Sequence, residues 1–257
     1  MRSRLLAALV AVLVVPVFVA CGSEESGSAN GDDGELVVSA ASSLTDPFEA
    51  YGKAFGGEVR FSFAGSDDLA AQIRQGVKPD VFAAANTSLP DELHAEGLVG
   101  RPVAFATNQL VLAVPMDSGD VIGLDGLGEP GTTIAIGSES VPIGSYTREV
   151  LARLGPRRAE AILANVRTEE PDVKGIVGKL AQGAVDAGFV YATDVRAAGG
   201  ELRGIALPAW LRPDVVYAAA VVADAPHPAA ARRFVADLVR GDAQAELRVA
   251  GFGPPPR

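Results

Sequence analysis

From Leu36 onward, short apolar segments alternate with longer amphipathic ones, and this alternation constrains the fold more than any other feature of the sequence. The first apolar segments predict strands at 36–39, 58–63 and 79–85. The amphipathic segments between and after them predict helices at 45–55, 67–75 and 88–96. Strands that alternate with helices in this way are typical of an α/β fold with a parallel sheet.

The alternation then repeats, which predicts a second lobe. After a strand at 109–115, the expected elements are strands at 132–136, 165–168 and 187–191 and helices at 146–154 and 172–182. A β-rich run at 215–222 and helices at 228–240 and 242–250 return to the first lobe. We therefore expect lobe I at 36–112 and 217–257 and lobe II at 113–216. Two crossings between the lobes predict a hinge with a ligand cleft, as in periplasmic binding proteins.

The N-terminus has the features of a secretory signal. Arg2 and Arg4 precede an apolar run at 5–20 that is too short and wrongly flanked for a membrane span. Cys21 follows directly, and its placement resembles the lipobox of bacterial lipoproteins, which implies acylation of Cys21. A plain signal peptide and an uncleaved anchor helix are the alternatives. Residues 21–35 are rich in Gly, Ser and acid and are expected to form a flexible tether.

The charge balance limits the possible ligands. Removing residues 1–20 takes away two arginines and no acid, so the formal net charge moves from −10 to −12. Such an acidic chain is not expected to bind nucleic acid, and it repels anions at long range. An anion site here must depend on aligned short-range donors. With one cysteine, the chain forms no internal disulfide and carries no catalytic cysteine elsewhere.

Two serine-bearing turns could hold an anion. Ser43 and Ser66 each stand where a predicted strand ends and a predicted helix begins. The first N–H groups of a helix lack intrahelical partners and lie at the positive end of its dipole. Either serine alone is more often only an N-cap. Two such turns facing each other could cage a small oxyanion.

Three further donors are expected in the second half of the chain. The loop 137–146 offers the backbone N–H of Ile143, and the helix start at 170–175 offers that of Val173. Tyr191 ends a buried strand, and its hydroxyl can donate to an anion without adding charge. The alternatives are an ordinary loop, a solvated helix start and a rim aromatic. Spacing alone does not decide the ligand.

The order of these segments resembles the molybdate-binding protein family, the solute receptors of bacterial importers for molybdate and tungstate. In the first half the matching segments are Ala41-Ser42-Ser43-Leu44, Phe63-Ala64-Gly65-Ser66, Leu69-Ala70-Ala71-Gln72-Ile73 and 76–85. In the second half they are Val141-Pro142-Ile143-Gly144, Pro171-Asp172-Val173-Lys174 and Val190-Tyr191-Ala192-Thr193-Asp194. Two positions depart from the family pattern: Ile143 replaces a smaller residue and Gly65 replaces a serine.

The resemblance implies a two-lobed periplasmic binding protein fold of type II. The oxyanion donors that it implies are Ser43, Ser66, Ile143, Val173 and Tyr191. It implies no enzymatic activity, no cofactor and no directly bound metal cation. The implied partners are a molybdate or tungstate ion and an ABC permease with its ATPase. A monomer anchored by lipid on the extracytoplasmic face of the cell membrane is expected.

Three alternatives remain open. The same fold could bind sulfate or a small organic anion. A secreted serine hydrolase would need His94 or His227 as base, and neither serine lies in a G-x-S-x-G motif. A metal-cation receptor would have only Asp67-Asp68 and Glu169-Glu170, which fit helix-start electrostatics better.

Overall fold

The computed structural model describes residues 34–118 and 123–256. The expected signal peptide, Cys21 and nearly all of the expected tether lie outside these residues. The description below concerns the compact unit Asp32–Arg257. No helix within the described residues has the length and apolar character needed to cross a membrane.

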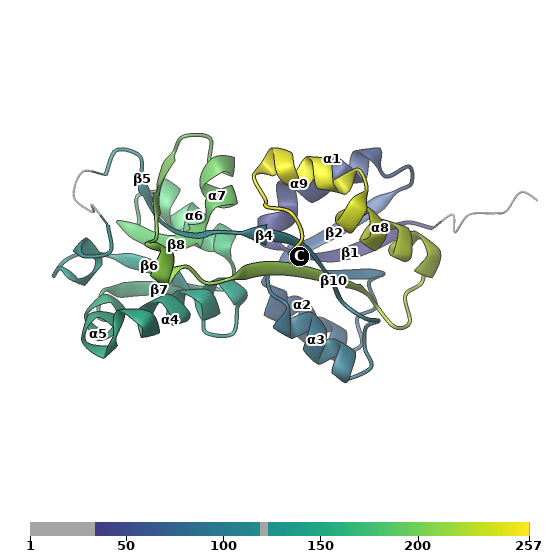
Figure 1. Cartoon of the computed structure of the whole chain (residues 1–257), viewed down its shortest axis with the longest axis horizontal. Coiled ribbons are helices and arrows are strands. Elements are labelled where there is room, and N and C mark those ends of the chain that lie inside the picture. The colour runs from purple at the N-terminus through teal and green to yellow at the C-terminus, as the bar shows by residue number, and fades with distance from the viewer. Residues whose placement is uncertain (1–33, 119–122, 257) are drawn as a thin grey trace, which may run out of the picture. The chain divides into compact units, whose positions relative to one another are not determined.

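The α/β prediction is confirmed, because the described residues form two five-stranded mixed sheets with helices on both faces (Figure 1). The first sheet has the strand order β2 (Val59–Ala64), β1 (Leu36–Ala41), β3 (Val81–Ala84), β10 (Val215–Val221) and β4 (Val103–Asn108). Its strands β1, β2 and β3 are parallel, whereas β10 runs antiparallel to β3 and β4.

The second sheet repeats this arrangement. Its strand order is β7 (Val166–Glu170), β6 (Ile134–Gly137), β8 (Ala187–Tyr191), β5 (Leu110–Pro115) and β9 (Leu202–Ala206). Strands β6, β7 and β8 are parallel, and β5 runs antiparallel to β8 and β9. In each sheet, three parallel strands therefore send their carboxyl ends to one edge.

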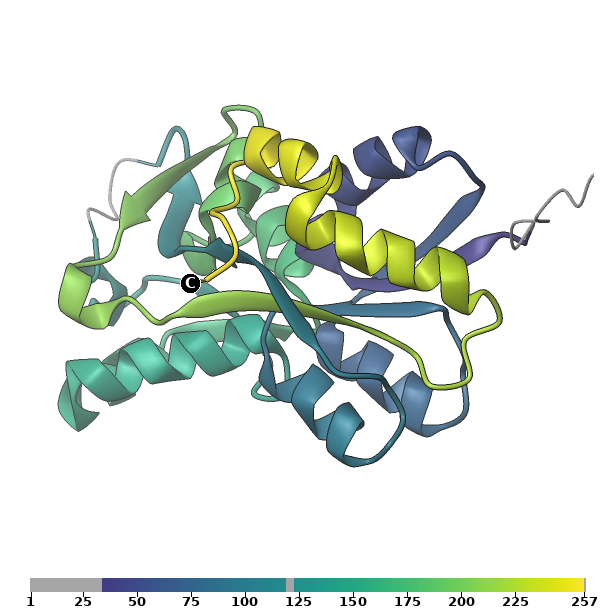
Figure 2. The ribbon, with the colours of Figure 1, turned by 45° about the vertical axis from the view of Figure 1, so that its right-hand side comes forward.

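Helices cover both faces of each sheet (Figures 1 and 2). On the first sheet, α2 (Ser66–Arg74) and α3 (Ser88–Ala95) cover one face, and α1 (Thr45–Ala54), α8 (Pro228–Arg240) and α9 (Ala243–Ala250) cover the other. On the second sheet, α4 (Pro142–Leu154) and α5 (Pro156–Leu163) lie opposite α6 (Val173–Ala181) and α7 (Ala192–Ala197). Within the described residues, 3₁₀ turns occur at Ser42–Leu44, Gly126–Gly128 and Ala209–Leu211.

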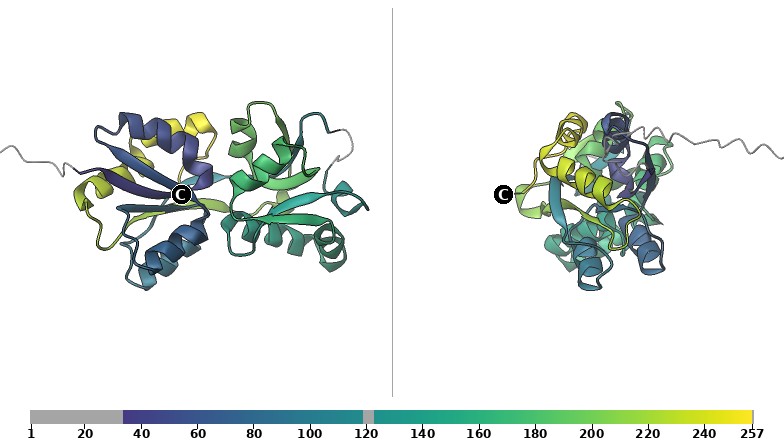
Figure 3. Two further views of the ribbon diagram at one scale, coloured as in Figure 1. Left: turned by 180° about the vertical axis from the view of Figure 1, so that it is seen from behind. Right: turned by 90° about the vertical axis from the view of Figure 1, so that its right-hand side faces the viewer.

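The chain passes between the sheets at two places, as expected for a hinged fold (Figure 3). The first is Gln109, the single residue between β4 and β5, and the second lies between β9 and β10. A continuous apolar core joins the sheets, and it includes Val38, Leu112 and Phe189, all fully buried. Helices α8 and α9 pack beside the first sheet and α1, where Phe234 contacts Phe48 with ring centroids 5.5 Å apart.

Several elements differ from the sequence expectation. Strands β4 and β9 and helices α5 and α7 were not expected, because each is short and lacks a clear apolar period. Helix α4 begins at Pro142 and not near Tyr146. Proline is well suited to the first helical position, since its fixed φ matches the helix and its missing N–H has no partner there. The segment expected as a loop around Ile143 is therefore the first turn of a helix.

Candidate oxyanion site

The five expected donors line one cavity, because each lies at or after the carboxyl end of a parallel strand. In the first sheet β1 and β2 end in register, with Ala41 opposite Ala64, so both serine turns leave the same edge. In the second sheet β6 and β7 end together, with Gly137 opposite Glu170. The cavity between these edges is lined by Ser43, Ser66, Ile143, Val173 and Tyr191. Their roles as ligand donors stay a prediction.

The cavity is small. Its volume is about 20 Å³, whereas sites for drug-sized ligands measure roughly 300–1,000 Å³. Backbone approach contributes to this narrowness at Gly65, where an added Cβ would stand 2.4 Å from the Pro171 carbonyl oxygen. A space of this size suits a small ion better than a sugar or an amino acid.

The alternative interpretation of the two serines as N-caps is wrong. Ser66 is the first residue of α2, and neither serine side chain caps its helix. The Ser43 hydroxyl is instead 2.9 Å from the Tyr217 hydroxyl, and the Ser66 hydroxyl accepts a hydrogen bond of 3.1 Å from the Ala85 N–H. Because the Ser66 oxygen accepts this bond through a lone pair, the Ser66 hydroxyl hydrogen stays available to donate, and Ser66 lines the cavity.

Ile143 and Val173 offer backbone donors from two helix starts. Ile143 is the second residue of α4 and Val173 is the first residue of α6, and both are buried. The N–H groups of a first helical turn have no intrahelical acceptor. The neighbouring Gly175 N–H is already bound to the Asp172 carboxylate at 3.1 Å. The free end of each helix therefore faces the cavity with donors and a positive dipole.

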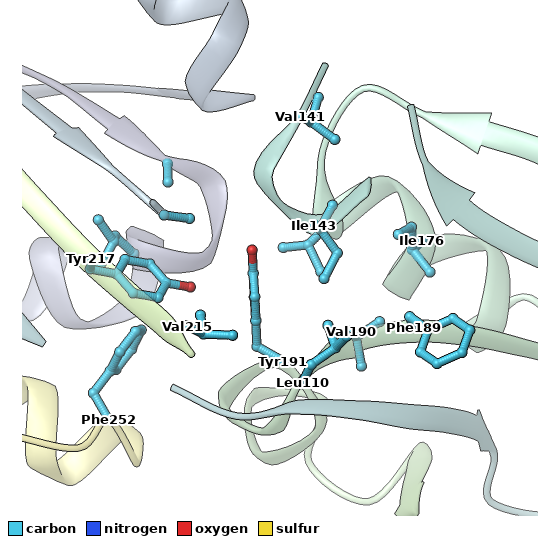
Figure 4. Close-up of a cluster of buried hydrophobic side chains, with 14 of the residues drawn as sticks. Leu110, Val141, Ile143, Ile176, Phe189, Val190, Tyr191, Val215, Tyr217 and Phe252 are labelled. Carbon is cyan, nitrogen blue, oxygen red and sulfur yellow. The ribbon is translucent and has the colours of Figure 1, made fainter. Parts of the chain in front are cut away.

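Tyr191 contributes a buried hydroxyl. Figure 4 shows its ring between Ile143 and Tyr217, on the strand that ends at the cavity. Within the described residues its hydroxyl has no hydrogen-bond partner, although the residue is 1% exposed. Burial raises the pKa of Tyr191 well above its ordinary value, so the hydroxyl keeps its proton. It is a neutral donor aimed at the space between the sheets.

The attraction of this site for an anion comes from dipoles and neutral donors, not from cationic side chains. Among the described residues that line the cavity, none is Lys, Arg or His. The one carboxylate in the lining, Asp172, already accepts the Gly175 N–H. Behind Tyr191, burial raises the pKa of Asp194 to about 7, and its carboxyl accepts the Tyr191 N–H at 3.1 Å. The arrangement can bind an acceptor-rich anion through neutral donors.

Sequence reasoning missed the residues behind the donors. Tyr217 is 174 positions from Ser43 and lies in a β-rich run that resembles core, so nothing in the sequence marks it as a partner. Asn108 closes β4, a strand that was not expected, and its amide lies 3.5 Å from the Tyr217 hydroxyl. The roles of both residues could not be predicted from the sequence, because they depend on how the strands pair across the sheet.

The two histidines of the chain lie away from this cavity. The His94 ring bonds to the Val99 carbonyl at 3.0 Å, and the His227 ring lies 3.2 Å from the Asp80 carboxylate. Neither histidine is among the residues that line the cavity with Ser43 and Ser66. The geometry provides no histidine base for a serine nucleophile there.

A small buried cavity of hydrogen-bond donors between two α/β lobes defines a solute-binding receptor. Residues 36–253 match the family model described as bacterial extracellular solute-binding protein. The chain belongs to that family and, within it, to the molybdate-binding proteins that its motifs resemble.

Named relatives agree with this assignment. The molybdate-binding protein ModA of Mycobacterium tuberculosis is 34% identical over 258 residues, which cover 96% of this chain and 97% of that protein. A putative ABC transporter substrate-binding lipoprotein, YvgL of Bacillus subtilis, is 28% identical over 97% of each chain. The solved periplasmic molybdate-binding protein of Azotobacter vinelandii has a TM-score of 0.76 and 26% identity, covering 86% of this chain and all of that one.

Proposed function

We propose that this protein is an extracytoplasmic receptor that binds molybdate in the cavity between its two sheets and delivers it to an ABC importer. The observation that carries the proposal is that the five expected donor residues all line one small cavity whose described lining has no Lys, Arg or His. The close relatives named for molybdate binding support the choice of ion.

The donors explain why a dianion would be preferred. Hydrogen bonds to an ionised acceptor are the strong ones, and a tetrahedral oxyanion presents acceptors in every direction. The five expected donors offer nothing to a protonated oxygen, so hydrogen phosphate held by them alone would leave its hydroxyl unpaired at a cost of about 1–3 kcal/mol. Fully ionised molybdate avoids that cost.

Further features belong to the same proposal. Tungstate has the charge and shape of molybdate and would occupy the same donors. The lipobox-like placement of Cys21 and the lipoprotein relative support a lipid anchor on the extracytoplasmic face. We propose a monomer that needs no cofactor, catalyses no reaction and hands its ion to a permease driven by a cytoplasmic ATPase.

Sulfate is the second candidate, because it is also a tetrahedral dianion and the same donors would serve it. Cavity size separates the two ions. Gly65 and Ile143, the two departures from the family pattern, both line the cavity and set its dimensions.

Calorimetric titration with molybdate, tungstate, sulfate and phosphate tests the proposal. Tight binding of molybdate and tungstate is expected, with phosphate weakest. A parallel thermal scan should show stabilisation of about 2.7 kcal/mol at 100 times the dissociation constant. Saturable binding of sulfate or an organic anion, with no heat from molybdate, would replace the proposed ligand.

A further inference from the structure

The Ser43 hydroxyl is the end of a chain of side-chain hydrogen bonds that begins at the hinge. Asn108, the last residue of β4, lies beside the crossing residue Gln109. Its Nδ2 is 3.5 Å from the Tyr217 hydroxyl, and that hydroxyl is 2.9 Å from Ser43 Oγ. Ser43 lines the cavity proposed for the anion.

The contacts of Asn108 determine which group donates in each of these hydrogen bonds. Its Oδ1 accepts the Gln109 N–H at 2.8 Å, so the other end of the amide is the nitrogen. The nitrogen has no lone pair to accept with and can only donate. It donates to Thr193 Oγ1 at 2.9 Å, across to the second lobe, and at 3.5 Å to Tyr217.

Tyr217 must therefore donate its hydroxyl hydrogen bond to Ser43 Oγ. Its side chain is 0% exposed, and a buried hydroxyl without an acceptor is unfavourable. Among its hydrogen-bond partners in the described residues, only Ser43 Oγ can accept. Once Ser43 Oγ accepts from Tyr217, the Ser43 hydrogen is left to point elsewhere, and the cavity lies beside it.

We propose that Tyr217 and Asn108 are positioning residues that lock Ser43 as a hydrogen-bond donor toward the bound ion. This inference rests on the proposed function and adds a determinant of specificity to it. A Ser43 hydroxyl that cannot turn to accept would reject a protonated oxygen at that position. Polarisation along the chain also strengthens the bond that Ser43 donates.

The variant Tyr217→Phe tests the lock, because it keeps the ring and removes only the hydroxyl. Molybdate affinity is expected to fall about tenfold in calorimetric titration. Affinity for inorganic phosphate should fall less, because a freed Ser43 can accept from the phosphate hydroxyl. The ratio of molybdate affinity to phosphate affinity is therefore the informative readout, because a merely structural defect would lower the affinity for both ions by the same factor.

A double-mutant cycle with Ser43→Ala isolates the coupling. Tyr217→Phe should cause no further loss of molybdate affinity when Ser43 is already replaced by alanine. The matched control is Tyr51→Phe, which also removes a buried tyrosine hydroxyl, one bound to Asp237 and outside the cavity lining. It should leave both affinities unchanged.

The outcomes separate the two proposals. Wild-type protein that does not bind molybdate overturns the proposed function and this inference with it. Wild-type protein that binds, with Tyr217→Phe causing the same loss whether or not the Ser43→Ala change is present, overturns the inference alone. An unchanged affinity ratio in Tyr217→Phe does the same.

Discussion

At the scale of single residues, the unpaired hydroxyl of Tyr191 should separate stability from binding. A buried donor without a partner costs about 1–3 kcal/mol. Tyr191→Phe is therefore expected to stabilise the ligand-free protein by about 1 kcal/mol while weakening molybdate binding by about 1.5–3 kcal/mol. Urea denaturation and calorimetric titration measure the two effects. A variant that loses stability and keeps its affinity would show that the hydroxyl serves the fold.

The two serines give a second test at this scale. Ser43→Ala and Ser66→Ala should each weaken molybdate binding by about 1.5–3 kcal/mol, the range for hydrogen bonds to charged groups. Ser66→Ala also leaves the Ala85 N–H without its acceptor, so only this variant should lose stability through a backbone group. Unchanged affinity in both variants, measured by calorimetry, would place the ligand elsewhere.

The positions of these residues could be predicted from the sequence, but their bonds could not. Ser43, Ser66, Val173 and Tyr191 stand at strand ends, and strand ends follow from local patterns of apolar residues. The bond from Tyr217 to Ser43 depends on β10 lying two strands from β1, which no local pattern encodes. The local pattern of apolar residues determines where a turn occurs, whereas the order of strands in the sheet determines which residues the turn contacts.

At the scale of elements, the turn between β2 and α2 packs directly against the loop before α6 in the other lobe. Gly65→Ala would place a Cβ 2.4 Å from the Pro171 carbonyl oxygen, so the two elements must move apart. Molybdate affinity should fall at least tenfold, since donors from both lobes could not reach the ion together. Small-angle scattering of the molybdate-saturated variant should report a larger radius of gyration than the wild type.

Gly178→Ala is the matched control for this change. It lies in α6, and a Cβ there meets nothing within 4 Å. Alanine is also the better helix former by about 1 kcal/mol, so stability should rise while affinity stays constant. Equal affinities for the Gly65 and Gly178 variants would show that the contact at Pro171 does not limit closure.

Element prediction succeeded where periodicity was long and failed where tertiary contacts define the element. Helix α8 has the bounds expected from its apolar period. Strand β9 is a five-residue strand with alternate exposure, held by pairing with β5, and it carries too few apolar residues to stand out. The early start of α4 follows from Pro142 at its first position, a signal that the polar surroundings of the segment concealed.

At the scale of the whole molecule, Asp194 should make stability depend on pH. Burial raises its pKa from 3.8 to about 7. Between about pH 4 and pH 7 the unfolded chain loses a proton that the folded protein keeps, so the Asp194 contribution falls as pH rises and levels off above pH 7. Asp194→Asn removes this term and can still accept the Tyr191 N–H through its amide oxygen.

The measurement is the difference in urea midpoint between Asp194→Asn and wild type. The variant should gain stability relative to wild type from pH 5 to pH 8. A difference that stays constant across this interval would mean that the Asp194 carboxyl ionises at its ordinary pKa in the folded protein.

The lack of a basic lining in the described cavity bears on how fast the ion arrives. Residues 21–257 carry a formal charge of −12, so a dianion approaches against repulsion. Sodium chloride shortens the range of that repulsion to about 10 Å at 0.1 M. The association rate constant for molybdate, measured by stopped flow, should therefore rise with salt concentration. At a site lined by cationic side chains it would fall. Chloride would compete with molybdate for cationic side chains at a binding site. A site made of amide and hydroxyl donors attracts chloride less, so it should keep binding a dilute tetrahedral dianion at high salt.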